Sequence, residues 1–382
     1  MDALTVLVVA TLDTKAAETD FLTECLSRHG VTSKKINLAL ETAGKVLDGA
    51  SKLEAMDAAV AKAIVDVDNA LADNVHAVVG LGGGTGGELI LKLMQSLPIT
   101  FPKVLITTLP FDPRIAVADS SIVLVPTLAD LCGLNATLRE ILENSAAMTA
   151  GLCNTRRHAG SCVADRSIGI TALGATNKAV KMLVDQLYHR QKEATVFHSN
   201  GFGGAAFARF AKRGAFDAIV DVTPHEMTRI KLVGAHVPMP ERFSAAGDLP
   251  RVVLPGALNF IGLGDKALVP GHYLERPHYE HSGFFTHVKV TPDEMKTVSL
   301  ALAESMNSLQ GPCSLVVPMG GFSHQDCSGG QIEDLSLREL FLATMRAALG
   351  THIPIKTVDA HISSQATVNE ILNSLDAVSG NE

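Results

Sequence analysis

Short β-branched apolar runs alternate with helical stretches along this chain, and each run ends in a turn rich in glycine or threonine. Residues 5–10 form such a run, which is followed by a polar turn over 11–15 and a helical periodicity over 16–29. Residues 76–81 form another apolar run, which leads through a glycine loop into a helical stretch over 88–97. Because strands that alternate with helices pair in parallel through right-handed crossovers, this pattern predicts an α/β fold built on parallel sheets.

The second half of the sequence repeats the plan of the first half. Residues 167–172 and 194–198 are predicted strands, and residues 178–189 between them are a predicted helix. A chain of 382 residues exceeds what one hydrophobic core usually serves. We therefore predict two Rossmann-like parallel-sheet subdomains facing a common cleft. Residues 1–160 would bind a nucleotide or phosphate through the glycine loop, and residues 161–382 would bind the substrate.

Composition restricts the classes of partner that the chain would bind. The formal net charge of −8 repels nucleic-acid backbones, and aromatic residues that would stack on bases are scarce, with no Trp and three Tyr. Six cysteines without a CxxC pair indicate reduced thiols, and the apolar run at the start is too short for a membrane span. We expect a cytoplasmic protein that binds neither nucleic acid nor membrane, with a homodimer as the default oligomer.

The glycine loop at 82–87 is the sharpest local signal in the sequence. Glycines let backbone N–H groups turn toward an anion, and the N-terminus of the following helix adds a partial positive charge. The loop matches the dinucleotide-binding pattern GxGxxG. However, Thr107 and Thr108 occupy the region where an acidic residue would hydrogen-bond the ribose, so a nicotinamide cofactor is disfavoured. The loop also lacks the Gly-Lys-Ser/Thr ending of a Walker loop. The alternative is that these glycines serve only tight packing.

The polar turn at 11–15 is a second candidate phosphate site. Its hydroxyls and ammonium could bind phosphate, and Asp13 could orient a magnesium ion. The alternative is a capping turn, with Asp13 or Thr14 as the N-cap of the following helix. The residues that we predict to bind the cofactor in this half are Thr11, Thr14, Lys15, Gly82, Gly83, Gly84, Thr85, Gly86, Gly87, Thr107 and Thr108.

Loops that follow strands in the second half supply the remaining candidates. The loop at 198–204 follows a strand and opens a helix, so it would add Gly201, Gly203 and Gly204 to the cofactor site. Asp221 ends the next strand and is, with Asp13, a predicted magnesium ligand. The predicted catalytic residues, which would position magnesium or transfer protons, are Asp13, Glu226, His281 and Asp326.

Two further clusters in the second half leave alternatives open. Four histidines crowd a loop-rich stretch, where they could ligate a metal, although loop histidines that merely form hydrogen bonds are commoner: His272, His278, His281 and His287. The run 323–326 contains Ser, His and Asp, but no G-x-S-x-G elbow surrounds the serine. A loop that positions the substrate is the better interpretation of this run.

Several short motifs, spread over nearly the whole chain, are informative when taken together. The first are Ala-Thr-Leu-Asp-Thr-Lys at 10–15, Gly-Leu-Gly-Gly-Gly-Thr-Gly-Gly at 80–87 and Pro102-Lys103. Later ones are 198–204, 221–226, 253–257, His281, 321–326 and His361-Ile362. In this order they resemble the ATP-binding domain family of the tomato mosaic virus resistance protein. The resemblance implies two Rossmann-like subdomains and the binding of ATP.

The chain departs from that family's pattern at several loops. The small turn expected after Thr108 is replaced by Leu-Pro-Phe-Asp-Pro at 109–113, and Pro224-His225 interrupts the turn before Glu226. The Asn-Pro expected after His281 and the Asn-Asp expected after Ile362 are both replaced. Because the first two motifs are kept, the family's anion binding carries over better than its substrate.

These observations lead to one main hypothesis and two rivals. The main hypothesis is an ATP-binding protein that acts as a transferase or hydrolase on a small metabolite with a magnesium nucleotide. The first rival is a nucleotide-independent enzyme acting on a small phosphorylated or carboxylic acid metabolite. The second rival is a non-catalytic binding module.

Overall fold

The chain forms two compact units, Met1–Val163 and Ala164–Glu382, each built around its own parallel sheet. The computed structural model describes residues 4–40, 46–72, 74–110, 112, 117–118, 120–158, 167–234 and 238–380, without the side chains of 155–158. The predicted boundary between residues 160 and 161 lies outside the described residues.

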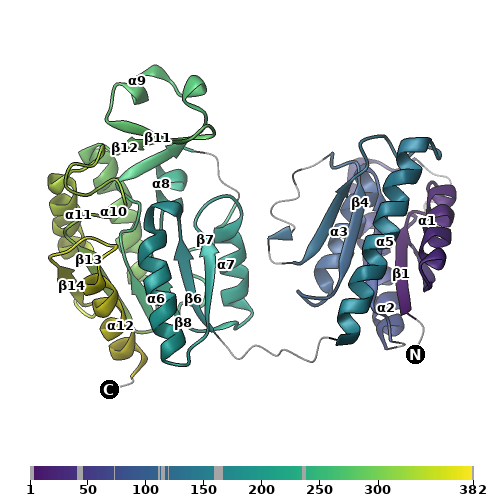
Figure 1. Cartoon of the computed structure of the whole chain (residues 1–382), viewed down its shortest axis with the longest axis horizontal. Helices are drawn as coiled ribbons and strands as arrows, with labels where there is room; N and C mark the ends of the chain where they lie inside the picture. The colour runs from purple at the N-terminus through teal and green to yellow at the C-terminus, as the bar shows by residue number, and fades with distance from the viewer. Residues whose placement is uncertain are drawn as a thin grey trace. The chain divides into compact units, whose positions relative to one another are not determined.

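The first unit alternates strands with helices. In chain order its elements are β1 (Leu4–Ala10), α1 (Ala16–Arg28), β2 (Val31–Asn37), α2 (Gly49–Leu71), β3 (Ala77–Gly82), α3 (Gly84–Ser96), β4 (Lys103–Thr107), β5 (Ile122–Pro126) and α5 (Ala136–His158). The five strands form one parallel sheet in the order β2-β1-β3-β4-β5 (Figure 1). The α/β prediction is therefore confirmed for this unit.

Strand β1 shows how the sequence produces the layers of the first unit. Val6 and Val8 pack with α1 and α5 on one face of the sheet, whereas Leu7 and Val9 pack with α2 and α3 on the other. All four side chains are fully buried. Because helices cover both faces of a parallel sheet, its strands are continuous apolar runs rather than alternating ones.

The second unit has the same alternation with one insertion. Its elements are β6 (Ser167–Ala172), η1 (Gly174–Thr176), α6 (Asn177–His189), β7 (Ala194–His198), α7 (Gly203–Lys212), β8 (Phe216–Asp221), α8 (Glu226–Lys231), β9 (Arg251–Val253), β10 (Phe260–Leu263), η2 (Lys266–Leu268), α9 (Gly271–Leu274), β11 (His278–Ser282), β12 (Phe285–Lys289), α10 (Pro292–Asn307), β13 (Cys313–Pro318), α11 (Leu335–Ala348), β14 (Ile355–Val358) and α12 (Gln365–Ser379).

Six of these strands form a second parallel sheet, in the order β14-β13-β9-β8-β6-β7. Helices α6 and α12 pack on one face, while α8, α10 and α11 pack on the other. The second half thus also confirms the predicted parallel architecture. Of the helices in the described ranges, none is long and apolar enough to span a membrane.

The stretch that the sequence analysis treats as loop-rich forms a small antiparallel sheet, in the order β10-β12-β11. It lies above the main sheet, at the top of the second unit as drawn in Figure 1. Strand β11 has the sequence His-Tyr-Glu-His-Ser and buries only Tyr279, so it lacks the apolar pattern by which strands are recognised. The loop interpretation of this stretch is therefore wrong.

Candidate functional site

The glycine loop joins the end of β3 directly to the start of α3. A Cβ on Gly82 would lie only 2.5 Å from the carbonyl carbon of Gly86 and 2.6 Å from the backbone nitrogen of Gly87. The backbone N–H of Gly87 in turn donates a 2.7 Å hydrogen bond to the carbonyl of Gly83. Glycine at position 82 is thus required by the close approach of the first helical turn, as the packing alternative proposes.

The next positions of the loop are open. The nearest described atom to a Cβ on Gly83 would be Oγ1 of Thr108, at 3.9 Å, and a Cβ on Gly86 would lie 3.6 Å from the side chain of Thr11. Thr11 follows β1 and Thr108 follows β4, the two strands that flank β3. Three turns from adjacent strands therefore meet at the carboxyl edge of the sheet. Packing does not explain the glycines at 83, 84 and 86.

The start of α3 gives this edge its electrostatic character. The first N–H groups of a helix have no acceptor within the helix, and the aligned peptide dipoles place a partial positive charge there. Gly84 is exposed, while Gly83, Thr85 and Gly86 are half-buried. Backbone donors around which no side chain crowds are what an anion requires.

The turn at 11–15 is held by its own backbone. The N–H groups of Thr14 and Lys15 donate to the carbonyl of Thr11 at 3.1 and 2.9 Å, and the hydroxyls of Thr11 and Thr14 lie 3.0 Å apart. The N-cap of α1 is Lys15, and no described side chain caps this helix end. The alternative that Asp13 or Thr14 serves as the N-cap is therefore wrong.

The charged residues of this turn differ in their surroundings. The ammonium of Lys15 is half-buried and donates a hydrogen bond to the carbonyl of Leu131, in the segment after β5. The carboxylate of Asp13 is exposed and bonds to no described residue. Lys15 is thus fixed beside the site, whereas Asp13 is available to solvent ions.

The loop after β4 is conformationally unusual. The hydroxyl of Thr107 accepts a long hydrogen bond of 3.4 Å from the N–H of Leu109, and Leu109 itself has a φ of 48°. Non-glycine residues seldom adopt positive φ, and such strain gathers at functional sites. A Cβ on Gly84 would lie 3.7 Å from Pro110, so this loop borders the open side of the glycine loop.

In the second unit, Asp221 and Glu226 share one buried arginine. Arg242 donates to the carboxylate of Asp221 at 2.8 and 2.9 Å and to Glu226 at 3.2 Å, and Thr171 donates to Asp221 at 2.7 Å. Burial raises the pKa of Asp221, but Arg242 and Thr171 outweigh burial and hold it below its usual value. Because protein donors engage both of its oxygens, Asp221 does not fit the predicted magnesium role.

Glu226 is less well satisfied than Asp221. Its Oε2 atom is buried and has no partner among the described residues, and burial raises the pKa of its carboxyl group. A Cβ on Gly204 would lie 2.5 Å from Oε1 of Glu226, and a Cβ on Gly203 would lie 1.8 Å from the carbonyl oxygen of His198. Packing therefore accounts for both glycines, while Gly201, with a φ of 63°, provides the turn before α7.

Asp326 anchors the loop after β13. Its carboxylate accepts hydrogen bonds from the N–H groups of Phe322, at 2.9 Å, and Asp334, at 3.2 Å, and pairs with Arg338. Burial nevertheless raises its pKa. Within the described ranges, no hydrogen bond or ion pair joins Asp326 to Glu226 or His281, so the structure does not assemble these predicted catalytic residues into one constellation.

Instead, His281 belongs to an aromatic cluster that sequence spacing did not reveal. Its ring stacks on His287 at a centroid distance of 4.8 Å, and His287 stacks on Phe260 at 4.1 Å. Nδ1 of His287 lies 2.7 Å from the hydroxyl of Tyr279, and Phe260 also contacts His225 at 4.7 Å. Four of these rings come from the small antiparallel sheet, and His225 comes from the loop after β8.

The buried histidines of this cluster are uncharged. Burial lowers the pKa of both His225 and His287 to about 3. Nδ1 of His225 donates to the carbonyl of Ala257 at 2.8 Å, which leaves Nε2 as an acceptor. No group of three or more His, Cys, Asp or Glu side chains that could hold a metal occurs in the described part of the chain, so the histidine metal alternative has no support there.

Comparison with known proteins connects both halves to one family. The N-terminal domain of the uncharacterised protein family UPF0261 matches residues 39–158, and its C-terminal domain matches residues 165–379. A UPF0261 protein of Rhizobium meliloti is 30% identical over 349 residues, which cover 86% of each chain. One of Clostridium tetani is 26% identical over 361 residues, which cover 87% of this chain and 89% of the relative.

The predicted resemblance is also confirmed. The ToMV resistance protein Tm-1(GCR237) of Solanum lycopersicum is 26% identical over 315 residues, which cover 80% of this chain and 42% of that protein. A crystal structure of MurG from Acinetobacter baumannii aligns with 100% of this chain and 95% of its own, but its TM-score of 0.23 at 11% identity supports no argument. From the two domain matches and these relatives, the chain belongs to the uncharacterised protein family UPF0261.

Proposed function

We propose that the first unit binds the phosphates of a nucleotide, in the first instance ATP, at the carboxyl edge of its sheet. The observation that carries the proposal is the meeting of three turns, from β1, β3 and β4, around the open positions Gly83, Gly84 and Gly86. Ligands of parallel α/β sheets bind at this edge. The resemblance to the tomato protein's ATP-binding domain family favours a nucleotide over other anions.

The residues at this edge suit a polyphosphate. The N–H groups at the start of α3 would hold one phosphate, and the hydroxyls of Thr11 and Thr108 would donate to its oxygens. The hydroxyl of Thr14 donates to the carbonyl of Thr11 at 3.3 Å and would have to turn away from it to join them. Lys15 would offset part of the negative charge. Each interaction at a helix N-terminus contributes only about 0.3–1 kcal/mol, so tight binding requires that these donors act together.

Asp13 is the residue of the first unit that suits a magnesium ion bound with the nucleotide. Its carboxylate is exposed at the end of β1, and magnesium in nucleotide sites commonly takes one or two carboxylates together with phosphate oxygens. Bound MgATP would supply a phosphoryl group for transfer. The residues of this chain would bind and orient that group.

A direct test is calorimetric titration of the full chain with ATP, ADP, NAD and tripolyphosphate, each with and without magnesium. The Gly84→Val variant places a side chain on the open face of the loop, where its Cβ would contact Pro110 at 3.7 Å, so we expect it to fold and to lose ATP binding. Gly151→Val is the matched control, because Gly151 is also helical, exposed and uncrowded by described atoms.

The outcomes separate the candidates. ATP binding by the control but not by Gly84→Val would support the proposal. If the protein bound tripolyphosphate as tightly as ATP, the site would recognise only the phosphates and not the nucleoside. Equal affinity of both variants for ATP would rule out the glycine loop as the site.

The aromatic cluster of the second unit supports a second candidate function, a nucleotide-independent enzyme that acts on a small acidic metabolite. The specific observation is that several polar atoms in or next to this cluster are buried and form no hydrogen bond with a described residue. These atoms are Oγ of Ser323, Oδ1 and Nδ2 of Asn259 and Oγ1 of Thr286. Buried polar groups are rarely left unpaired, and a ligand is one way to satisfy them.

In this second candidate, the neutral His225 and His287 would act as hydrogen-bonding groups, because a pKa near 3 makes an imidazole a weak base at neutral pH. His281 is exposed and would exchange the proton with the substrate. A screen of sugar phosphates and small carboxylic acids with the parent chain and with His281→Gln tests this. Turnover of some metabolite that is unaffected by His281→Gln would contradict the assignment.

A further inference from the structure

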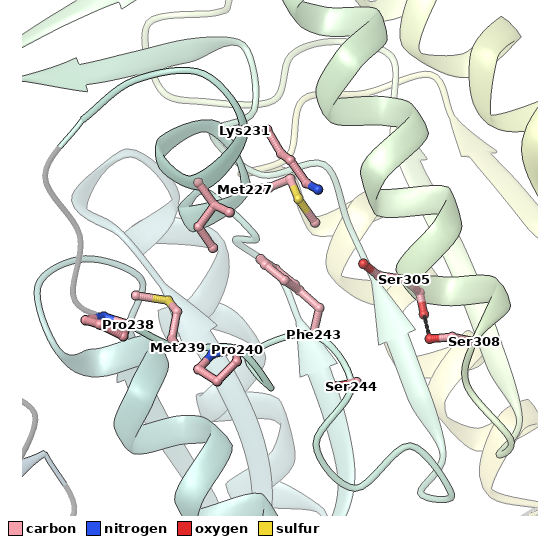
Figure 2. Close-up of a pocket in the computed structure, with 10 residues that line it drawn as sticks. Met227, Lys231, Pro238, Met239, Pro240, Phe243, Ser244, Ser305 and Ser308 are labelled. Atoms are coloured by element: carbon pink, nitrogen blue, oxygen red, sulfur yellow. Dashed lines mark hydrogen bonds between the residues drawn. The ribbon is translucent and has the colours of Figure 1, made fainter.

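A cavity of about 470 Å³ opens on the second unit, between α8, α10 and the segment 238–244 (Figure 2). None of the residues that the sequence analysis selected lines it. Binding sites for small molecules commonly measure about 300–1,000 Å³ and are mostly apolar with a few polar groups. In size the cavity is therefore that of a small-molecule site.

The inner wall of the cavity is apolar and well supported. Met227 and Met239 are 2% and 6% exposed, and in Figure 2 Phe243 lies below Met227 and between Met239 and Ser305 of α10. The ring of Phe243 packs under the buried guanidinium of Arg242, at 4.7 Å. Methionine adapts its shape to a bound apolar group, whereas a ring held against a fixed ion pair does not move freely. This wall is suited to an apolar body of moderate size.

Lys231 gives the cavity its charge. It lies at the end of α8, and the part of the chain that the structure describes offers its ammonium no hydrogen bond or ion pair. No acidic residue is among the described residues that line the cavity. An unpaired ammonium beside an apolar wall attracts an anionic group.

The serines on the other side of the cavity do not add donors for an anion. The hydroxyl of Ser305 donates to the carbonyl of Ala301 at 2.9 Å, and that of Ser308 donates to the carbonyl of Ser305 at 2.7 Å. Each hydroxyl has one hydrogen, so both oxygens remain as acceptors only. Of the side chains that line the cavity, Lys231 thus supplies one cation and the exposed Ser244 one further hydroxyl donor, which is not the array of donors that a polyphosphate requires.

We propose that this cavity binds a small monoanion with an apolar body, of the class of medium-chain or aryl-substituted carboxylic acids, with the carboxylate on Lys231. The apolar body lies against Met227, Met239 and Phe243. This site is separate from the nucleotide site proposed for the first unit and does not depend on it.

Titration of the full chain with matched acids and alcohols tests the proposal. The probes are octanoate and 4-phenylbutyrate, and their neutral counterparts are 1-octanol and 4-phenyl-1-butanol. We expect one equivalent of each acid to bind at least tenfold more tightly than its alcohol. Lys231→Met keeps the apolar stem and removes the charge, so it should abolish this preference, while Lys178→Met, an exposed lysine on α6, should retain it.

A second variant tests whether the apolar body of the ligand lies in the cavity. Ser244 is exposed at the rim, so Ser244→Trp should fill the cavity without disturbing the core and should weaken acids and alcohols alike by at least tenfold. The unfolding temperature of each variant shows whether it is folded. A preference for acids that survives Lys231→Met, binding that survives Ser244→Trp, or no binding of either acid up to its solubility would each overturn the proposal.

Discussion

Arg242 holds the carboxylate of Asp221 through two hydrogen bonds, of 2.8 and 2.9 Å, in a part of the second unit where both side chains are almost fully buried. The pair joins the end of β8 to the segment that follows α8. Because both side chains are buried, removing one of them leaves the other charge unpaired and out of contact with water. This unpaired charge lowers the free energy of unfolding of the protein.

Removing this arginine should destabilise the second unit strongly. Arg242→Met keeps most of the apolar stem but leaves Asp221 and Glu226 without their cation, and breaking a buried pair typically costs about 3–5 kcal/mol. Urea denaturation followed by circular dichroism measures the loss. The double variant Arg242→Met with Asp221→Asn should be more stable than Arg242→Met alone, and a double variant that is less stable would contradict the ion-pair explanation.

The glycine loop should show two kinds of glycine. Gly82→Ala forces a methyl group to within 2.5 Å of backbone atoms, which should cost about 1–3 kcal/mol of unfolding free energy. Gly84→Ala places a methyl group in ordinary van der Waals contact with Pro110, at 3.7 Å, and should change stability by no more than about 0.5 kcal/mol. Parallel denaturation of both variants checks this, and equal losses would mean that the loop relaxes.

Stability should fall in weakly acidic solution because of the buried histidines. The folded pKa of His225 is about 3, well below its unfolded value of about 6.5, so the unfolded chain binds the proton first as the pH falls. This contribution is complete above pH 6.5 and decreases between about pH 6.5 and 3. From pH 7.5 to pH 5 it amounts to about 2 kcal/mol.

Denaturation at those two pH values measures the total decrease, and histidine NMR signals assign it. The imidazole signals of His225 and His287 should not titrate between pH 5 and 8 in the folded chain. Titration of either ring near pH 6.5 would show that it is hydrated or paired in a way that the structure does not contain.

Lys15→Met should weaken ATP binding about tenfold and reduce its dependence on salt, because the ammonium lies at the proposed phosphate site. The same change removes a hydrogen bond to the carbonyl of Leu131 and should lower stability by about 1 kcal/mol. Calorimetry at low and high sodium chloride measures the first effect. Lys34→Met, at an exposed position within β2, is the control and should leave the affinity unchanged.

The parallel sheets could be predicted because buried strands such as β1 and β3 are continuous apolar runs bounded by turns. The meeting of the turns after β1, β3 and β4 follows from parallel order, since carboxyl ends of adjacent strands share an edge. The small antiparallel sheet escaped prediction because β11 is polar and its residues pair with β12 rather than with the core.

Less of the candidate site could be predicted in the second unit, because the partners of each candidate residue lie far away along the chain. Arg242 carries no local motif, and only the need of a buried Asp221 for a cation could have indicated that such a residue exists. Gly203 and Gly204 follow a strand as phosphate-binding glycines do, yet the backbone of His198 and the carboxylate of Glu226 occupy the space beside them. A glycine pattern does not distinguish close packing from an open loop.

The strand order of each sheet also determines the position of its topological switch point. β1 and β3 are neighbours, but α1 and α3, which follow them, pack on opposite faces of the sheet, and the same holds for β6 and β8 with α6 and α8. Between such strands the outgoing connections diverge, and this topological switch point is where parallel α/β folds commonly bind their ligands. Its place is a consequence of winding direction. Relatives that keep the strand order can exchange their loop residues, and so their ligands, without moving the switch point.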